Sequence, residues 1–148
     1  MKYYLIIACI SFFTLTNCSL NDVNNDDIPQ VTRILWHLKN VSGGVDGVDN
    51  DFPTNKIVWE FNNATLKLTV SNTNTDTSIE DGLDSGTYTY SINEVGSDAY
   101  ISINSNEVGK ITITESGNKL TINQNLKSTG SGADGYIYTF DKSIIVEN

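Results

Sequence analysis

The sequence predicts an all-β protein whose strands form an eight-stranded, antiparallel up-and-down (meander) barrel. Three observations support this: apolar residues recur at every second position from residue 30 onward, helical periodicity is absent, and most links between the apolar runs are short. A period of two places the apolar side chains on one face of each strand. Closing the sheet on itself buries that face and removes exposed edges.

Eight apolar runs mark the predicted strands, each about six residues long. They are Ile34-Trp36-Leu38, Ile57-Trp59-Phe61, Leu66-Leu68-Val70, Tyr88-Tyr90-Ile92, Ala99-Ile101-Ile103, Ile111-Ile113, Leu120-Ile122 and Tyr136-Tyr138-Phe140. Thr and Ser fill many alternate positions, so the outer face is expected to be solvated. A β-sandwich is the alternative, but the sequence gives no sign of the Greek-key links and disulfide that often accompany one.

The links between the runs also favour a meander. Short links with turn residues, such as Ser116-Gly117-Asn118, join antiparallel neighbours. Three longer links, at residues 42–56, 71–85 and 127–134, are rich in Gly, Asp, Asn, Ser and Thr. In an up-and-down order all three lie at one end of the barrel. The barrel domain is expected at residues 31–142, followed by a C-terminal tail at 143–148.

The N-terminus has the pattern of a secretory signal. Lys2 gives a positive start, residues 3–13 are largely apolar, and the segment ends at Leu15-Thr16-Asn17-Cys18. The apolar part is too short for a spanning helix. An ordinary signal peptide and an uncleaved anchor are the alternatives to the interpretation that follows.

The last residues of this segment resemble a bacterial lipoprotein lipobox, with Leu15 at the third position before Cys18, although Asn17 stands where Gly or Ala is usual. The resemblance implies removal of residues 1–17 and attachment of a diacylglycerol and an acyl chain to Cys18. Several chains anchor stably because each buried methylene contributes about 0.8 kcal/mol. Residues 18–30 are expected to form an acidic, flexible tether. The expected location is the cell envelope, at the outer membrane, facing the periplasm or the surface.

Cysteine use and charge exclude several classes of function. Of the two cysteines, Cys9 would leave with the signal and Cys18 would be modified, so no disulfide, thiolate metal site or cysteine nucleophile is expected. Without Lys2, eight Lys or Arg stand against eighteen Asp or Glu. This acidic balance argues against a nucleic-acid partner.

Several stretches resemble the small lipocalin-like domains of bacterial envelope lipoproteins. They are "ILWHLKNVSGG", "IVWEF", "SGTYTYSI", "NKLTI" and "DGYIYTFDK", spread over residues 31–142. The resemblance implies an eight-stranded barrel whose mouth binds a small apolar molecule, with Trp36 in the place of a tryptophan that plugs one end. The chain departs from larger lipocalins in having Ile34 where a Gly precedes that tryptophan, and in showing no C-terminal helix.

Six aromatic residues are the candidate lining of that barrel: Trp59, Phe61, Tyr88, Tyr90, Tyr138 and Phe140. Barrels of eight strands either enclose one small ligand or are filled by side chains. We therefore expect a non-enzymatic protein that binds a small hydrophobic or amphipathic ligand. The alternative is a structural or adhesive lipoprotein whose packed barrel displays acidic loops to a partner, and in that case the tyrosines serve cross-strand packing.

The remaining candidates for chemistry are weak. Asp46, Asp49 and Asp51 lie in a Gly-rich stretch that could bind calcium, but the EF-hand pattern is absent and a solvated acidic loop is the commoner outcome. His37 is the sole histidine, and strand parity points it away from Trp36, toward solvent. No Gly-x-Ser-x-Gly motif occurs. Neither an enzyme nor a cofactor is expected.

Overall fold

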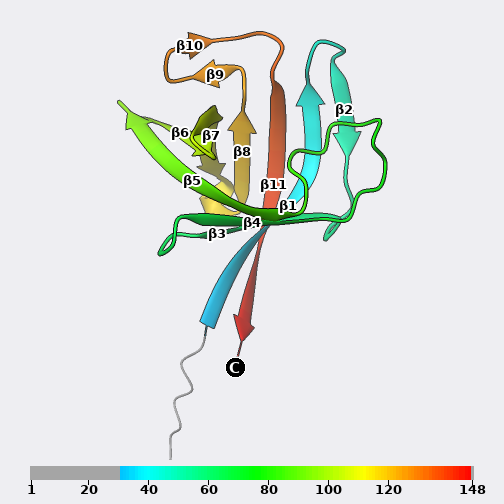
Figure 1. The fold of residues 1–148 in the computed structure, drawn as a ribbon, viewed down its shortest axis with the longest axis vertical. Coiled ribbons are helices and arrows are strands. Elements are labelled where there is room, and N and C mark those ends of the chain that lie inside the picture. Colours follow the sequence, from blue (N-terminus) through cyan, green and yellow to red (C-terminus); the bar gives the residue numbers. More distant parts are fainter. Residues whose placement is uncertain (1–30, 148) are drawn as a thin grey trace, which may run out of the picture.

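A computed structural model of the chain describes residues 31–147, which form a closed antiparallel β-barrel (Figure 1). Eight strands follow one another around it: β1 (Val31–Gly43), β3 (Ile57–Asn62), β4 (Lys67–Asn72), β5 (Gly86–Val95), β6 (Asp98–Ile103), β7 (Asn106–Thr114), β8 (Lys119–Asn123) and β11 (Tyr136–Glu147). Pairing of β11 with β1 closes the barrel. The predicted eight-stranded up-and-down barrel is thus confirmed. Within the described residues, no helix has the length and apolarity needed to cross a bilayer.

The seam between β1 and β11 is longer than the sequence predicts. These strands have 13 and 12 residues, and their register runs from Val31 opposite Glu147 to Gly43 opposite Tyr136. β11 does not stop at Lys142, where a tail was expected to begin, but continues through the β-branched residues of the "SIIVE" stretch. Such residues favour extended backbone. Residues 143–147 therefore belong to the sheet.

Two of the predicted long links contain additional strands. β2 (Val48–Asp51) folds back on the end of β1 through a turn at residues 44–47. β9 (Leu126–Lys127) and β10 (Gly130–Ser131) form a small hairpin before β11. β2 is not predicted, because its residues, Val-Asp-Asn-Asp, show no apolar alternation. The strand order places all three long links at one end of the barrel, as predicted.

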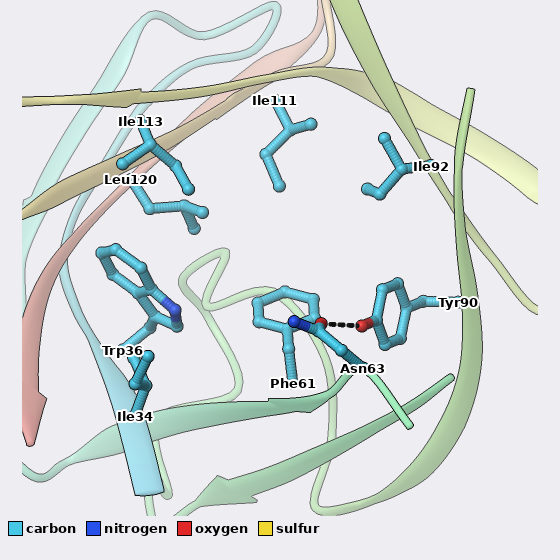
Figure 2. A pocket seen from close by; sticks show the side chains of 9 residues that line it. All are labelled: Ile34, Trp36, Phe61, Asn63, Tyr90, Ile92, Ile111, Ile113 and Leu120. Atoms are coloured by element: carbon cyan, nitrogen blue, oxygen red, sulfur yellow. Dashed lines mark hydrogen bonds between the residues drawn. The ribbon is translucent and has the colours of Figure 1, made fainter. Parts of the chain in front are cut away.

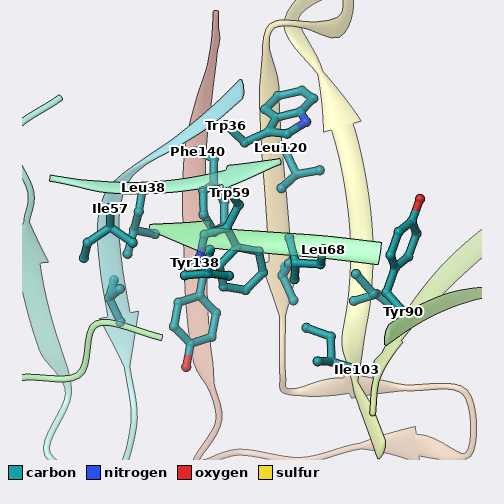
Figure 3. Packing of buried hydrophobic residues seen from close by; sticks show 14 of the residues in the cluster. Trp36, Leu38, Ile57, Trp59, Leu68, Tyr90, Ile103, Leu120, Tyr138 and Phe140 are labelled. Carbon is teal, nitrogen blue, oxygen red and sulfur yellow. The ribbon is translucent and has the colours of Figure 1, made fainter. Parts of the chain in front are cut away.

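Inward-facing side chains fill the middle of the barrel (Figure 3). The ring centroids of Trp59 and Phe140 lie 5.0 Å apart at its centre. The largest fully buried side chains are Phe140, Leu38, Ile57, Leu68, Ile101, Leu120, Ile122 and Val41. Each fully buried side chain of this kind contributes about 1.5–3 kcal/mol by leaving water. The middle of the barrel is therefore a packed core.

The link at residues 73–85 covers one end of this core. Ile79 and Leu83 pack against the core, and the Tyr138 hydroxyl donates a 2.8 Å hydrogen bond to Glu80 Oε1. Gly82 has a φ of +90°, and a Cβ at this position would lie 3.5 Å from the Trp59 ring. This left-handed conformation suits glycine. With this end covered, an opening into the barrel has to lie at the opposite end.

His37 departs from its predicted environment, because its side chain is buried and not in solvent. It lies opposite Val58 on β3 and Asp141 on β11, and its Nε2 makes a 2.7 Å hydrogen bond with the Ser143 hydroxyl. The neighbouring strands β3 and β11 thus cover the outer face of β1 at His37. Burial, with the nearby charge of Lys39, lowers the pKa of the imidazole below 6.5.

Candidate ligand-binding site

An apolar cavity of about 240 Å³ opens at the end of the barrel where β1 begins (Figure 2). Side chains from β1, β3, β5, β7, β8 and the turn after β3 line it: Ile34, Trp36, Phe61, Asn63, Tyr90, Ile92, Ile111, Ile113 and Leu120. None of the nine carries a formal charge. The cavity is therefore a neutral, largely aliphatic and aromatic site.

Strand periodicity explains how these residues meet. Ile34 and Trp36 are two residues apart on β1, as are Ile111 and Ile113 on β7, so each pair points to one side of its strand. Because neighbouring strands alternate in direction, early residues of β1 and late residues of β7 lie at the same end. The same rule brings Ile92, late in β5, to the rim of the cavity.

The polar part of the lining is a hydrogen-bonded pair. The hydroxyl of Tyr90 donates to Asn63 Oδ1 at 2.6 Å, and burial raises the pKa of this phenol above its ordinary value. The turn is held by Asn62, whose Oδ1 accepts from the backbone N–H groups of Ala64 and Thr65 at 3.1 and 3.0 Å. The phenol is thus neutral and fixed, and the pair offers polar atoms beside an apolar wall.

The six aromatic residues predicted to line the barrel divide into three groups. Phe61 and Tyr90 line the cavity, and their ring centroids lie 5.1 Å apart. The other four do not line it: Trp59, Tyr138 and Phe140 are buried in the core, and Tyr88 donates a 2.8 Å hydrogen bond to the carbonyl of Asp84 near the covered end.

Most of the cavity residues are aliphatic ones for which the sequence pattern predicts only a place on a strand. Ile92 and Ile113 are the clearest examples, since both lie near the end of a strand at the open end of the barrel. Their position next to a turn was the available signal. An apolar residue at a strand end has fewer neighbours to cover it than one at the middle.

The candidate calcium ligands lie at the other end. Asp49 and Asp51 share one face of β2, where both accept hydrogen bonds from Asn40 Nδ2, at 2.7 and 3.0 Å. Asp46 belongs to the preceding turn. Among residues 31–147, no group of three or more His, Cys, Asp or Glu side chains is placed to hold a metal ion. The structure thus assigns Asp49 and Asp51 a contact with an amide.

A second hollow, of about 270 Å³, lies within the 73–85 link and is polar. Asp76, Asp81 and Asp84 contribute to its wall. Asn74 Nδ2 donates to the carbonyl of Asp76 at 3.1 Å and to Asp81 Oδ2 at 2.9 Å. These bonds hold the link in shape and give the carboxylate of Asp81 an amide partner.

The predicted lipidation site, Cys18, lies outside the described residues. Comparison of the chain with family models, curated proteins and solved structures gave no match.

Proposed function

We propose that this chain is a lipid-anchored, lipocalin-like envelope protein that binds a small hydrophobic or amphipathic molecule without transforming it. The cavity carries the proposal. Its lining offers apolar surface and one amide–phenol pair, and it includes no carboxylate, imidazole, amine or thiol. Such a lining favours binding over acid–base or nucleophilic chemistry.

The size of the cavity supports a small ligand or one end of a longer molecule. Its volume of about 240 Å³ exceeds the roughly 150 Å³ of an apolar cavity that binds benzene. It falls below the range of about 300–1,000 Å³ typical of drug-sized ligands. A single ring with substituents fits a cavity of this size, and so does an acyl chain that enters it end-first. The Tyr90–Asn63 pair would then meet a hydroxyl, carbonyl or ester group.

The anchor is proposed at Cys18. The lipobox-like segment before it supplies the motif, and a tether at residues 18–30 would connect the lipid to β1. On this proposal the protein is held at the outer membrane, with the membrane and an apolar small molecule as its partners and with no resident cofactor.

Native mass spectrometry tests the ligand directly. The full protein is extracted from cell envelopes, and its native mass is compared with its denatured mass. We expect an excess mass that denaturation releases. Ile92→Trp places a bulky indole ring at the rim of the cavity, so this variant should lose the excess mass. Ile145→Trp, on the ribbon formed by residues 31–35 and 143–147, is the control and should keep it. The denatured mass also shows whether Cys18 carries acyl chains.

The packed core favours a second candidate, a scaffold that displays its acidic links to a protein partner. Trp59 and Phe140 fill the middle of the barrel, so a ligand is not enclosed at its centre. A native mass without bound ligand, unchanged after incubation with fatty acids and isoprenoids, would overturn the binding proposal in favour of this scaffold.

A further inference from the structure

The two longest strands extend beyond the barrel at its open end. Residues 31–35 of β1 pair with residues 143–147 of β11, and the backbone pairing of β3 and β8 begins only beyond them. Figure 1 shows this two-stranded ribbon projecting from the barrel. Its side chains face the cavity on one side and solvent on the other.

The apolar surface of the cavity continues along the inner face of this ribbon. Ile34, a cavity residue, is directly opposite Ile144, and Val146 follows two residues further on. With Ile92 and Ile113 across the rim, these side chains are 44–57% exposed. Exposed apolar residues that form a continuous patch mark interaction sites, whereas scattered ones need no explanation. We call these five residues the mouth face.

Charge is distributed unevenly between the two ends of the barrel. At the covered end, the three long links at residues 42–56, 71–85 and 127–134 contain eight Asp or Glu and two Lys. Near the mouth face, most carboxylates are paired: Arg33 contacts both Glu60 and Glu147, and Lys119 contacts Glu115. Glu94 on β5 is the exception, with no ion pair among the described residues. An anionic surface would therefore repel the covered end more strongly than the mouth face.

We propose that the mouth face lies on the surface of a lipid bilayer. Val31, where the preceding residues join the barrel, is at the free end of the ribbon, so the chain leaves from the mouth side. The inference rests on the proposed anchor at Cys18. Twelve residues lie between Cys18 and Val31, which limits the separation to about 45 Å for an extended chain. Isoleucine and valine side chains then enter the boundary between headgroups and acyl chains.

This orientation specifies the source of the ligand. A mouth that opens onto the bilayer receives an acyl chain or another membrane-dissolved molecule without exposing it to water. The ligand class is therefore a lipid tail, with the Tyr90–Asn63 pair beside its polar end.

Site-specific fluorescent labelling tests the orientation. The processed, acylated chain would have no free thiol, so single cysteines at Ile144→Cys and Ile113→Cys can carry an environment-sensitive dye. Val45→Cys, at the exposed turn of the covered end, is the matched control. The full protein is placed in vesicles of phosphatidylethanolamine and phosphatidylglycerol that contain a spin-labelled lipid. We expect dyes at 144 and 113 to shift to shorter wavelength and to be quenched, and the dye at 45 to do neither.

Three outcomes would overturn this inference. Equal responses at 144 and 45, or quenching at 45 alone, would show a different orientation. A response at 144 that follows protein concentration and ignores the lipid quencher would assign the face to a second copy of the chain. The anchor is tested separately, because a denatured mass without acyl chains at Cys18 would contradict it. In that case the protein is added to preformed vesicles at excess lipid, and the dyes at 144 and 113 test the mouth face without the anchor.

Discussion

Trp36 and Trp59 are directly opposite each other on β1 and β3, yet only Trp36 lines the cavity. Trp59 packs on Phe140 in the core, with ring centroids 5.0 Å apart. The two tryptophans therefore mark the boundary between the packed part of the barrel and its open end. They are also the only tryptophans in the chain, which makes this boundary accessible to spectroscopy.

The core and the rim should respond differently to truncation. Leu38→Ala removes a fully buried side chain and should lower the free energy of unfolding by about 2–5 kcal/mol. Ile113→Ala, at a side chain that is 57% exposed, should cost less than about 1 kcal/mol but weaken ligand binding about tenfold, since two buried methylenes contribute about 1.6 kcal/mol. Urea unfolding and ligand titration measure the two effects. Loss of stability at Ile113 comparable to that at Leu38 would contradict the assignment of Ile113 to the rim.

The link at residues 73–85 should depend on the hydroxyl of Tyr138. It donates to Glu80 and accepts from Gln124 Nε2 at 3.2 Å. Tyr138→Phe removes both bonds and leaves Glu80 to find water, so the free energy of unfolding should fall by about 1–2 kcal/mol. Proteolysis within the link should also become faster. Tyr88→Phe, which removes one bond to an exposed backbone carbonyl, is the control and should change the stability little.

Stability should depend on pH through His37. Its pKa in the folded state is below 6.5 because the ring is desolvated, whereas the unfolded chain has an ordinary value near 6.5. The unfolded state therefore takes up the proton first, so stability is complete above about pH 6.5 and falls as the pH decreases below it. His37→Gln keeps a partner for Ser143 without titrating. Thermal melts of this variant should lose the part of the slope that begins as the pH falls below about 6.5. An unchanged slope would assign it to other groups.

Two glycines should differ sharply in their tolerance of a methyl group. A Cβ at Gly109 would lie 2.2 Å from the backbone oxygen of Asn123 on β8, so Gly109→Ala must push β7 and β8 apart. We expect a loss of more than about 2 kcal/mol. Gly132→Ala, in the β10–β11 link, meets no atom within 4 Å and should leave the stability within about 0.5 kcal/mol. Chemical unfolding of both variants measures the difference.

The barrel could be predicted from the sequence because the signal is local and repeated. Runs such as Ile57-Trp59-Phe61 give the inward face of a strand, and short turns give antiparallel order. β2 and the extension of β11 escaped the prediction for opposite reasons. β2 is a polar strand stabilised by its pairing with β1, and Ile144-Ile145-Val146 is an apolar run without alternation.

The cavity could be predicted only in part, since its location depends on which end of the barrel is covered. Phe61 and Tyr90 were identified by their aromatic character, but the same criterion selected Trp59 and Phe140, which fill the core. Parity gives the face of a strand and not the depth of a residue along the barrel. The burial of His37 escaped for a related reason, because parity points it outward and its cover comes from β11, far away in the sequence.

The most direct test of a ligand site at the open end is quenching of Trp36 by a terminally brominated medium-chain fatty acid. Trp59→Phe leaves Trp36 as the sole emitter, and Trp36→Phe leaves Trp59. Trp59 Nε1 has no hydrogen-bond partner among the described residues, so its replacement removes no such bond. With the full protein in vesicles, we expect saturable quenching of Trp36, relieved by the unbrominated acid, and little quenching of Trp59. Equal quenching of both, or none that saturates at Trp36, would contradict a ligand site at the open end of the barrel.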